Sequence, residues 1–436
     1  MLRLRTKIRL EELSLALMIL GQCYVWLLED ILDMHLLILL FSAGAFAVLL
    51  AKRKMNAVSG GWVFLLYLLG IYLSFVFSGG SFRAIYRFAV VILLLLFVNI
   101  ADFDTDTLAF TRKGLVMTGV IGVVFVLIQF VLKDTFTNPF YSILSANSRT
   151  DALHYYTRGY YSGIITKPHE AAGFISFAMA SILMDGWLKN RKTQMVMALL
   201  LAVPLLLTGK RAIFVFAFAA LFCVYAFVQV ANRKFLKTLV VCAVAAVLAV
   251  LAVLVIMANA ENPMFARFAK LIAKAGESLL DATRVSLWAD AWNLWLDNFW
   301  FGVGWRGFPE LTITLFSYSR SHSVNLDYLQ FLCETGLVGF LLMMTPIIFM
   351  ARRTWILGKY AAKTDMPTEQ KLQIFLAVFV QVFILVYAMV EVPFYSTMYF
   401  ALYIYSCIIV NAYYTKLPGI RRGRKIRFVL GGVREN

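Results

Sequence analysis

Long apolar runs alternate with short polar stretches along this 436-residue chain. A membrane-spanning helix needs about 20 predominantly apolar residues. On that criterion the pattern predicts twelve spans, near residues 12–28, 34–51, 61–78, 88–101, 115–132, 170–188, 194–208, 212–231, 238–258, 324–350, 373–391 and 397–413. The run at 194–208 is short and contains Pro204, so a full span and a re-entrant half-helix both fit it. An even number of spans leaves both ends of the chain on the same side.

The composition agrees with this pattern. Hydrophobic residues make up 61% of the chain, charged residues 15%, and the mean hydropathy is +0.79. A soluble domain has roughly 25% charged residues. The sequence therefore predicts an all-α polytopic membrane protein. Its five cysteines are scattered, without a CxxC or Cys/His cluster, so neither a disulfide framework nor a thiolate metal site is indicated.

The positive charges predict the orientation. Most of the 41 lysines and arginines fall in the short segments on the side of the N-terminus, which the positive-inside rule assigns to the cytoplasm. We therefore expect residues 1–258 to hold nine spans with an outward loop at 133–170, residues 259–323 to form a large outward loop, and residues 324–436 to hold three spans and a basic cytoplasmic tail. The net charge of +17 then reflects topology, and nucleic-acid binding is not expected.

Two short outward turns carry cations against this bias. One contains Arg83 and Arg87, and the other contains Lys210 and Arg211 with almost no loop between the flanking spans. Such side chains can extend to lipid headgroups, or they can form an anion site that faces a substrate. Arg211 also opens the following helix, whose N-terminal dipole favours an anion.

The two outward loops have different characters. The first contains Arg158 and ends at Glu170. Its tyrosines could stack on sugar rings or form an aromatic belt at the membrane interface. These tyrosines are Tyr155, Tyr156, Tyr160 and Tyr161. The second begins with a predicted basic amphipathic helix near 264–280. A stripe of tryptophans at helical spacing follows, more typical of packing than of binding, and then a glycine-rich turn: Trp288, Trp292, Trp295, Gly302, Gly304 and Gly307.

The outward segments supply arginines and one histidine as the candidate chemistry. The candidate binding residues are Lys210, Arg158, Arg211, Arg284, Arg320 and Glu170, with Glu334 at a helix entrance. His322 is the candidate base, because an imidazole can remove a proton near neutral pH. Arginine can neutralise a phosphate without a metal. We expect no metal site and no cofactor; the DFDTD run at 102–106 is interpreted as a solvated turn on the inner side.

Several of these motifs resemble the superfamily of O-antigen ligases and Wzy-type polysaccharide polymerases. The resemblance rests on His322 with LDYLQFLCETGLVG behind it, on the run from Arg284 to FWFGVGWRGF, and on TGKRA at Arg211. A weaker similarity lies in RGYYSGIITKPHEAAGF, which begins at Arg158. Together these cover roughly the C-terminal two-thirds of the chain. The chain departs from the family pattern at Ser323 and at His169, where the family tends to have asparagine.

The resemblance implies a metal-independent, inverting glycosyltransferase in the bacterial inner membrane, with its active site on the outer face. It implies an undecaprenyl-diphosphate-linked oligosaccharide as donor, held by Arg211 and Arg284, and a glycan or lipid-linked acceptor activated by His322. Membrane lipid is an expected partner, and a chain-length regulator is a further one. The departures at Ser323 and His169 affect the residues expected to act on the acceptor. Arg211 and Arg284 match the arginines of the family pattern.

Three functions remain open at this point. A polymerase transfers the glycan to another lipid-linked repeat unit, and the glycine-rich turn and tyrosine-rich loop favour it. A ligase transfers the glycan to lipid A–core. A transporter of lipid-linked glycans also fits twelve spans, but transporters place ionisable groups near the bilayer midplane and often show repeated halves, which this sequence does not suggest. A purely structural scaffold is disfavoured by the costly Lys210–Arg211 pair.

Overall fold

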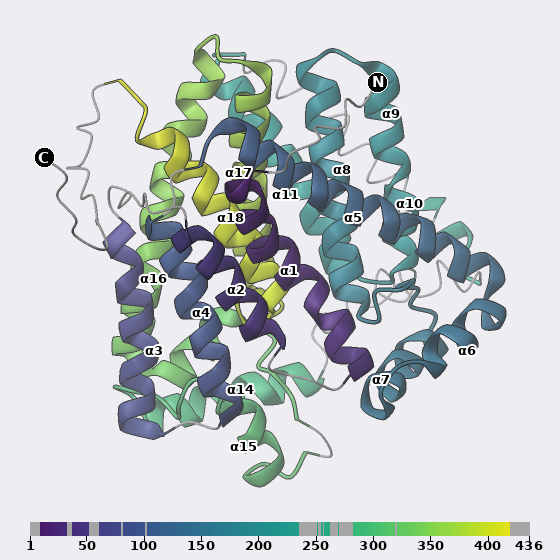
Figure 1. The fold of residues 1–436 in the computed structure, drawn as a ribbon. Helices are drawn as coiled ribbons and strands as arrows, with labels where there is room; N and C mark the ends of the chain where they lie inside the picture. The colour runs from purple at the N-terminus through teal and green to yellow at the C-terminus, as the bar shows by residue number, and fades with distance from the viewer. Residues whose placement is uncertain are drawn as a thin grey trace, which may run out of the picture.

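The computed structural model describes residues 9–32, 37–51, 61–79, 82–100, 103–234, 254–255, 257–261, 282–318 and 321–418, with single residues 251 and 269. Every regular element within these ranges is a helix, as the sequence predicts (Figure 1). The elements are α1 (Leu10–Leu32), α2 (Leu37–Ala51), η1 (Gly61–Val63), α3 (Phe64–Ser78), α4 (Phe82–Ile100), α5 (Thr105–Leu132), α6 (Asp134–Ser142), α7 (Ala146–Thr157), α8 (Pro168–Leu188), α9 (Lys192–Leu200), α10 (Ala202–Leu207), α11 (Arg211–Ala231), α14 (Ala282–Asp297), α15 (Phe308–Thr314), α16 (Asp327–Lys363), α17 (Thr368–Tyr387), η3 (Pro393–Tyr395) and α18 (Thr397–Tyr414).

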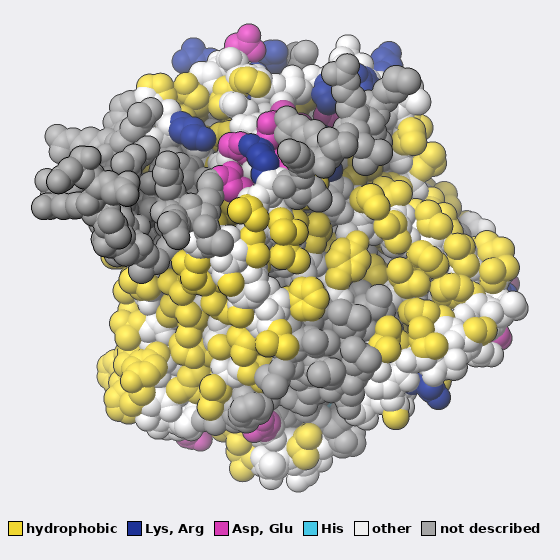
Figure 2. Space-filling model, viewed as in Figure 1, with side chains coloured by type: hydrophobic (Ala, Val, Ile, Leu, Met, Phe, Trp, Pro, Cys, Tyr) yellow, Lys and Arg dark blue, Asp and Glu magenta, His cyan; other side chains and the backbone are white. Residues whose placement is uncertain are grey.

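Five of these helices are long and apolar enough to cross a membrane: α5, α8, α11, α16 and α17. Shorter apolar helices cover 39–50, 64–78, 84–99 and 192–207. The visible surface carries a broad band of hydrophobic side chains, and charged side chains gather near the end where α16 meets α17 (Figure 2). A multi-pass membrane protein explains this band. The expected span at 238–258 and the amphipathic helix at 264–280 lie largely outside the described residues, so the count of twelve stays a prediction.

The apolar run at 194–208 does not form one straight helix. It divides into α9 and α10, which meet at Leu201. Pro204 explains the break, because its ring lacks an N–H and conflicts with the carbonyl of Leu200 four residues earlier.

The segment at 133–170, which we expected to be an outward loop, is also more regular than a loop. It contains the helices α6 and α7, which project from one side of the bundle (Figure 1).

Two interior helices organise the packing. Most of the central part of α8 and of α17 is buried, and α18 lies against both.

Close approach between helices depends on small residues. At Gly70 in α3, a Cβ would lie 2.9 Å from the carbonyl oxygen of Gly339 in α16, so this pair sets the spacing of the two helices.

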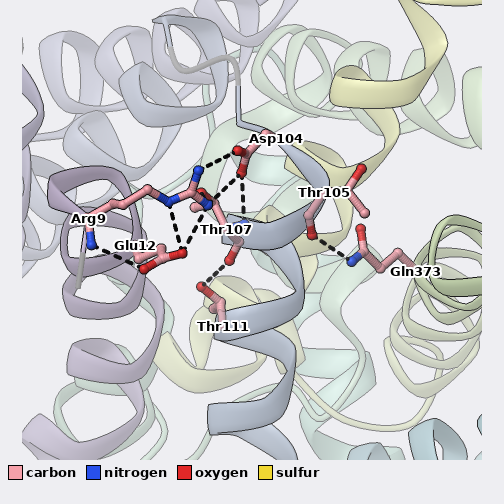
Figure 3. Close-up of polar contacts among 7 residues, drawn as sticks. All are labelled: Arg9, Glu12, Asp104, Thr105, Thr107, Thr111 and Gln373. Carbon is pink, nitrogen blue, oxygen red and sulfur yellow. Dashed lines mark hydrogen bonds and ion pairs between the residues drawn. The ribbon is translucent and has the colours of Figure 1, made fainter. Parts of the chain in front are cut away.

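The end of the bundle near the α16–α17 turn is closed by a polar network (Figure 3). Asp104 caps α5 by accepting from the Thr107 amide at 2.8 Å, and it also accepts from Arg9 Nη1 at 2.7 Å. Arg9 donates in turn to Glu12 on α1. Nearby, Gln373 of α17 donates to the main-chain oxygen of Thr105. Asp104 is exposed, as the solvated turn predicts, and its carboxylate also joins α1 to α5.

Candidate functional site

The other end of the bundle, where α14 and α15 lie, holds the candidate site (Figure 1). The starts of α8 and α18 meet there, because the Tyr399 hydroxyl donates to the His169 carbonyl at 2.5 Å. The start of α16 meets the end of α17, because the Asp327 amide donates to the Ala388 carbonyl at 2.9 Å. We call this region the α14 end.

Arg284 lies near the start of α14 and forms an ion pair with Glu391, just beyond α17. Its Nη2 lies 3.1 Å from Glu391 Oε1, and its Nη1 donates to the Val390 carbonyl at 3.2 Å. Both side chains are about one-third exposed, at 35% and 28%. A partly exposed pair of this kind contributes little to stability, so its main effect is to orient the guanidinium.

Lys210 directly precedes α11 and lies among aromatic rings of the first outward segment. Its Nζ is 5.4 Å from the ring centre of Tyr155 and 5.6 Å from that of Tyr160, within cation–π distance. Gly209 makes this approach feasible: its φ is +71°, and a Cβ there would lie 2.3 Å from the Tyr160 ring. Arg211 follows as the half-buried first residue of α11. Arg158 lies at the end of α7 and is exposed.

His169 and Glu170 begin α8 beside Lys210. His169 Nε2 lies 3.9 Å from Oε1 of the buried Glu170, and the imidazole is within electrostatic reach of Lys210 and Lys167. Glu170 and Glu391 both act electrostatically on the Tyr399 hydroxyl. Lys210, His169, Glu170, Tyr399, Glu391 and Arg284 therefore form a series of polar side chains within electrostatic reach of their neighbours, which we call the polar path.

His322 lies in the segment between α15 and α16. Its amide donates to Thr312 Oγ1 at 3.0 Å, and its ring meets the Tyr318 ring edge-on at 5.4 Å. The Tyr318 hydroxyl donates to Asp290 Oδ2 of α14 at 3.0 Å. Two residues after His322, the Val324 carbonyl accepts from Trp288 Nε1, which confirms a packing role for this member of the tryptophan stripe. Arg320 lies outside the described residues.

Glu334, expected at a helix entrance, has a structural position instead. It is buried in α16 and accepts from the Arg306 amide at 2.7 Å, the Tyr395 hydroxyl at 2.6 Å and Gln330 Nε2 at 3.0 Å. Three donors explain how a carboxylate can be buried here. Glu334 therefore fastens the glycine-rich turn and the η3 segment to α16.

The glycine-rich turn packs against a kink in α16. Gly336 has a φ of +64°, which interrupts the helix and frees carbonyl groups. The Cys333 and Glu334 carbonyls accept from the amides of Val303 and Gly304, both at 3.0 Å. The backbone groups lost at the kink are thus satisfied by the turn, as buried backbone requires.

The structure brings some predicted residues together and adds others. Lys210, Arg284 and Glu170 lie along one polar path, and Arg211 adjoins Lys210 at the start of α11. Sequence reasoning missed Glu391, Tyr399 and the position of His169 beside Lys210. The sequence could have indicated Glu391, because it is a carboxylate at the end of the apolar run at 373–391, and a charged group in such a position usually has a function. The arrangement can bind an anion and accept a proton on an imidazole.

Comparison with known families gives one result for this region. Residues 195–344 match the family model described as O-antigen ligase. The matched segment begins in α9, includes Lys210, Arg211, Arg284 and His322, and ends in α16. No curated protein matches the chain.

Proposed function

Because residues 195–344 match the family model described as O-antigen ligase, we propose that this protein is a membrane glycosyltransferase, and specifically a polysaccharide polymerase. In this proposal it transfers a glycan from undecaprenyl diphosphate to a lipid-linked repeat unit, on the outer face of the bacterial inner membrane. Both termini and the α16–α17 turn are cytoplasmic, and the α14 end faces outward. The expected chain-length regulator would act with it there.

The observation that carries the proposal is the polar path within and beside the matched domain. Lys210 and Arg284 lie at its two ends, and Arg211 adjoins Lys210 at the start of α11. In the proposal these cations bind the donor diphosphate, and the Lys210-facing tyrosines supply stacking surfaces for sugar rings. Arginine suits this role because its planar fork matches phosphate oxygens.

The proposed reaction is a single displacement with inversion. The acceptor hydroxyl oxygen attacks the anomeric carbon on the face opposite the diphosphate and forms the new glycosidic bond. The bond between the anomeric carbon and the diphosphate oxygen breaks, and undecaprenyl diphosphate leaves with the electron pair. His322 takes the proton of the hydroxyl as general base. The cations stabilise the charge that develops on the leaving diphosphate, so no metal ion is required.

Reconstituted vesicles with an undecaprenyl-diphosphate-linked repeat unit test this proposal. We expect Arg284→Gln and Lys210→Gln to lower transfer by roughly 10²-fold, because each removes a charge that stabilises the leaving group. Arg191→Gln is the matched control, because it removes an exposed cation between α8 and α9. EDTA should leave the rate unchanged. Full activity in both site variants, or a strict requirement for Mg²⁺, would overturn the mechanism.

The ligase reaction is the second candidate, favoured by the description of the matched family itself. It uses the same donor site and differs in the acceptor. Supplying lipid A–core together with the lipid-linked repeat unit separates the two reactions. Elongated lipid-linked glycan supports the polymerase, and glycan attached only to lipid A–core supports the ligase.

A further inference from the structure

A second cationic position lies at the α14 end, on the glycine-rich turn. It is a pocket of 310 Å³ between the end of α3, the glycine-rich turn and α15, lined by Ser78, Gly304, Trp305, Arg306, Glu310 and Thr314. Arg306 is held here in a left-handed conformation, with φ at +62°. A non-glycine residue in this region is strained, and such strain clusters at functional sites.

The guanidinium of Arg306 is clamped but incompletely bonded. It lies 5.1 Å from the ring centre of Trp305 and 5.4 Å from that of Tyr395, and its Nη2 donates to the Tyr395 carbonyl at 2.6 Å. Its Nε is buried without a hydrogen-bond partner. Among the described residues it forms no ion pair, because Glu334 receives the main-chain amide of Arg306 and not its side chain. A buried N–H of this kind needs an acceptor.

Arg87 adds to the positive charge beside Arg306. It is one of the cations that the sequence places against the orientation rule, and its Nη1 donates to Thr397 Oγ1 at 2.6 Å. Burial, reinforced by the neighbouring Arg87, lowers the pKa of Arg306 to about 10. A bound anion would reverse this effect, since an opposite charge stabilises the protonated guanidinium.

An apolar groove lies near this position and is connected with it through Phe88, which contacts Trp305. It lies between α3 and α4 and is lined by Leu65, Leu66, Leu68, Leu69, Tyr72, Phe88 and Ile92. Leu65 and Tyr72 are more than half exposed. Phe88 and Phe75 both contact the Trp305 ring, at centroid distances of 6.3 Å and 6.0 Å. Apolar side chains therefore continue from the groove to the base of the Arg306 pocket.

We propose that the groove and the pocket together bind a second polyprenyl diphosphate lipid, with its tail between α3 and α4 and its diphosphate at Arg306 and Arg87. The chemistry of the two parts is complementary to such a lipid, because a long apolar chain matches the groove and an anionic head matches the guanidiniums. The inference rests on the proposed polymerase reaction, which joins two lipid-linked glycans and so needs a second site for the acceptor lipid.

Counting bound lipids on the full-length protein by native mass spectrometry tests this site, with undecaprenyl diphosphate as the probe. We expect the unmodified protein to bind two molecules. The Arg87→Gln/Arg306→Gln variant should bind one, with roughly 10- to 100-fold weaker affinity at the second site, the effect of losing charged hydrogen bonds. Arg191→Gln is the matched control and should keep both lipids, because it removes an exposed cation between α8 and α9.

Variants at the proposed donor site, where Lys210 and Arg284 lie, separate this inference from the proposed function. The double variant Lys210→Gln/Arg284→Gln should lose the donor lipid and keep the lipid bound at Arg306. If this variant keeps both lipids while the Arg87/Arg306 variant loses one, the donor assignment fails and the second site stands. If the Arg87/Arg306 variant still binds two, the second site is overturned.

Three further measurements cover misfolding and lipid identity. Leu69→Trp fills the groove without touching either arginine and should also cost one lipid; retention of both would overturn the groove assignment. Arg306→Lys keeps the charge and should bind the second lipid more tightly than Arg306→Gln. Displacement of the second undecaprenyl diphosphate by phosphatidylglycerol would show a general anionic-lipid site and contradict the acceptor role.

Discussion

Two histidines at the α14 end lie in different surroundings. His322 rests against Tyr318 in the segment that precedes α16, whereas His169 begins α8 between Glu170 and the lysines at 167 and 210. The residues that match the family model, 195–344, include His322, whereas His169 lies before them in the sequence. In our proposal His322 is the base and His169 is a positioning residue whose carbonyl holds Tyr399.

Replacing each histidine with alanine tests that assignment. His322→Ala should lower the transfer rate at saturating substrate by 10²- to 10⁴-fold, the usual effect of removing a general base. His169→Ala should keep the rate within roughly tenfold, because its main-chain contact with Tyr399 survives. Initial rates with the lipid-linked repeat unit provide the measurement. A larger loss in His169→Ala than in His322→Ala would transfer the base role to His169.

Asp104 provides a second residue-level prediction, about stability. Burial opposes ionisation, but hydrogen bonds from Arg9 and Thr107 prevail and lower the pKa of Asp104 to about 2. A lowered carboxyl pKa stabilises the fold above the unfolded value of about 3.9, and this contribution disappears as the pH falls towards 2.

Thermal unfolding of Asp104 variants separates the ion pair from the helix cap. Asp104→Asn keeps a good capping residue and should cost about 0–1 kcal/mol, the value of an exposed ion pair. Asp104→Ala loses both and should cost about 1–2 kcal/mol. Both differences should shrink below pH 3, because the wild-type carboxylate becomes protonated. Equal effects of the two substitutions at neutral pH would show that the ion pair dominates.

At the level of elements, the kink in α16 is the feature on which the α14 end depends. The amides at 303 and 304 pair with carbonyls freed by Gly336, and in this way the turn that carries Arg306 is fixed to α16. A Cβ at Gly336 would lie 2.3 Å from the main-chain carbon of Trp300. Neither the turn nor the helix can move without disturbing the other.

Alanine substitution at Gly336 should therefore be severe. We expect a loss of more than about 3 kcal/mol, from the left-handed φ and the backbone clash together. Gly44→Ala in α2 is the control, because nothing lies within 4 Å of its added Cβ and its φ is ordinary. Folded yield and the melting temperature in detergent measure both. Equal yields from the two variants would contradict the account of the kink.

Hydrophobic runs predicted most of the described helices, and Pro204 signalled the interruption of the run at 194–208. The kink at Gly336 was not predictable, because it depends on contacts with the turn at 303 and 304, far away in the sequence. For the site, likewise, single residues were predictable from the sequence and the contacts between them were not. Arg284 was identifiable as an outward cation, but its partner Glu391 is 107 residues away, and periodicity carries no information about such a contact. The position of Arg306 beside Arg87 was hidden for the same reason.

At the level of the whole molecule, the two ends of the bundle have different compositions. The α16–α17 end carries ion pairs such as Arg9–Asp104 and Arg112–Glu369, which connect helices. The α14 end carries the polar path and the Arg306 pocket. This asymmetry supports an orientation in which the first end is cytoplasmic and the second meets substrates from the outer face.

Cysteine labelling in intact cells tests that orientation. Glu310→Cys and Asp365→Cys place exposed thiols at the α14 end and in the α16–α17 turn, in a variant without the native cysteines. A membrane-impermeant maleimide should label the thiol at 310 in intact cells and the thiol at 365 only after lysis, because the reagent cannot cross the membrane. The reverse pattern would invert the proposed topology.

The most direct test of the central claim is a product count with purified protein and one substrate, the undecaprenyl-diphosphate-linked repeat unit. The proposed polymerase joins two such molecules through one new glycosidic bond. We predict a lipid-linked glycan of twice the length, with one undecaprenyl diphosphate released per bond, and loss of both products in Arg284→Gln. Unchanged glycan length without released undecaprenyl diphosphate, from protein that still binds this substrate, would contradict the account.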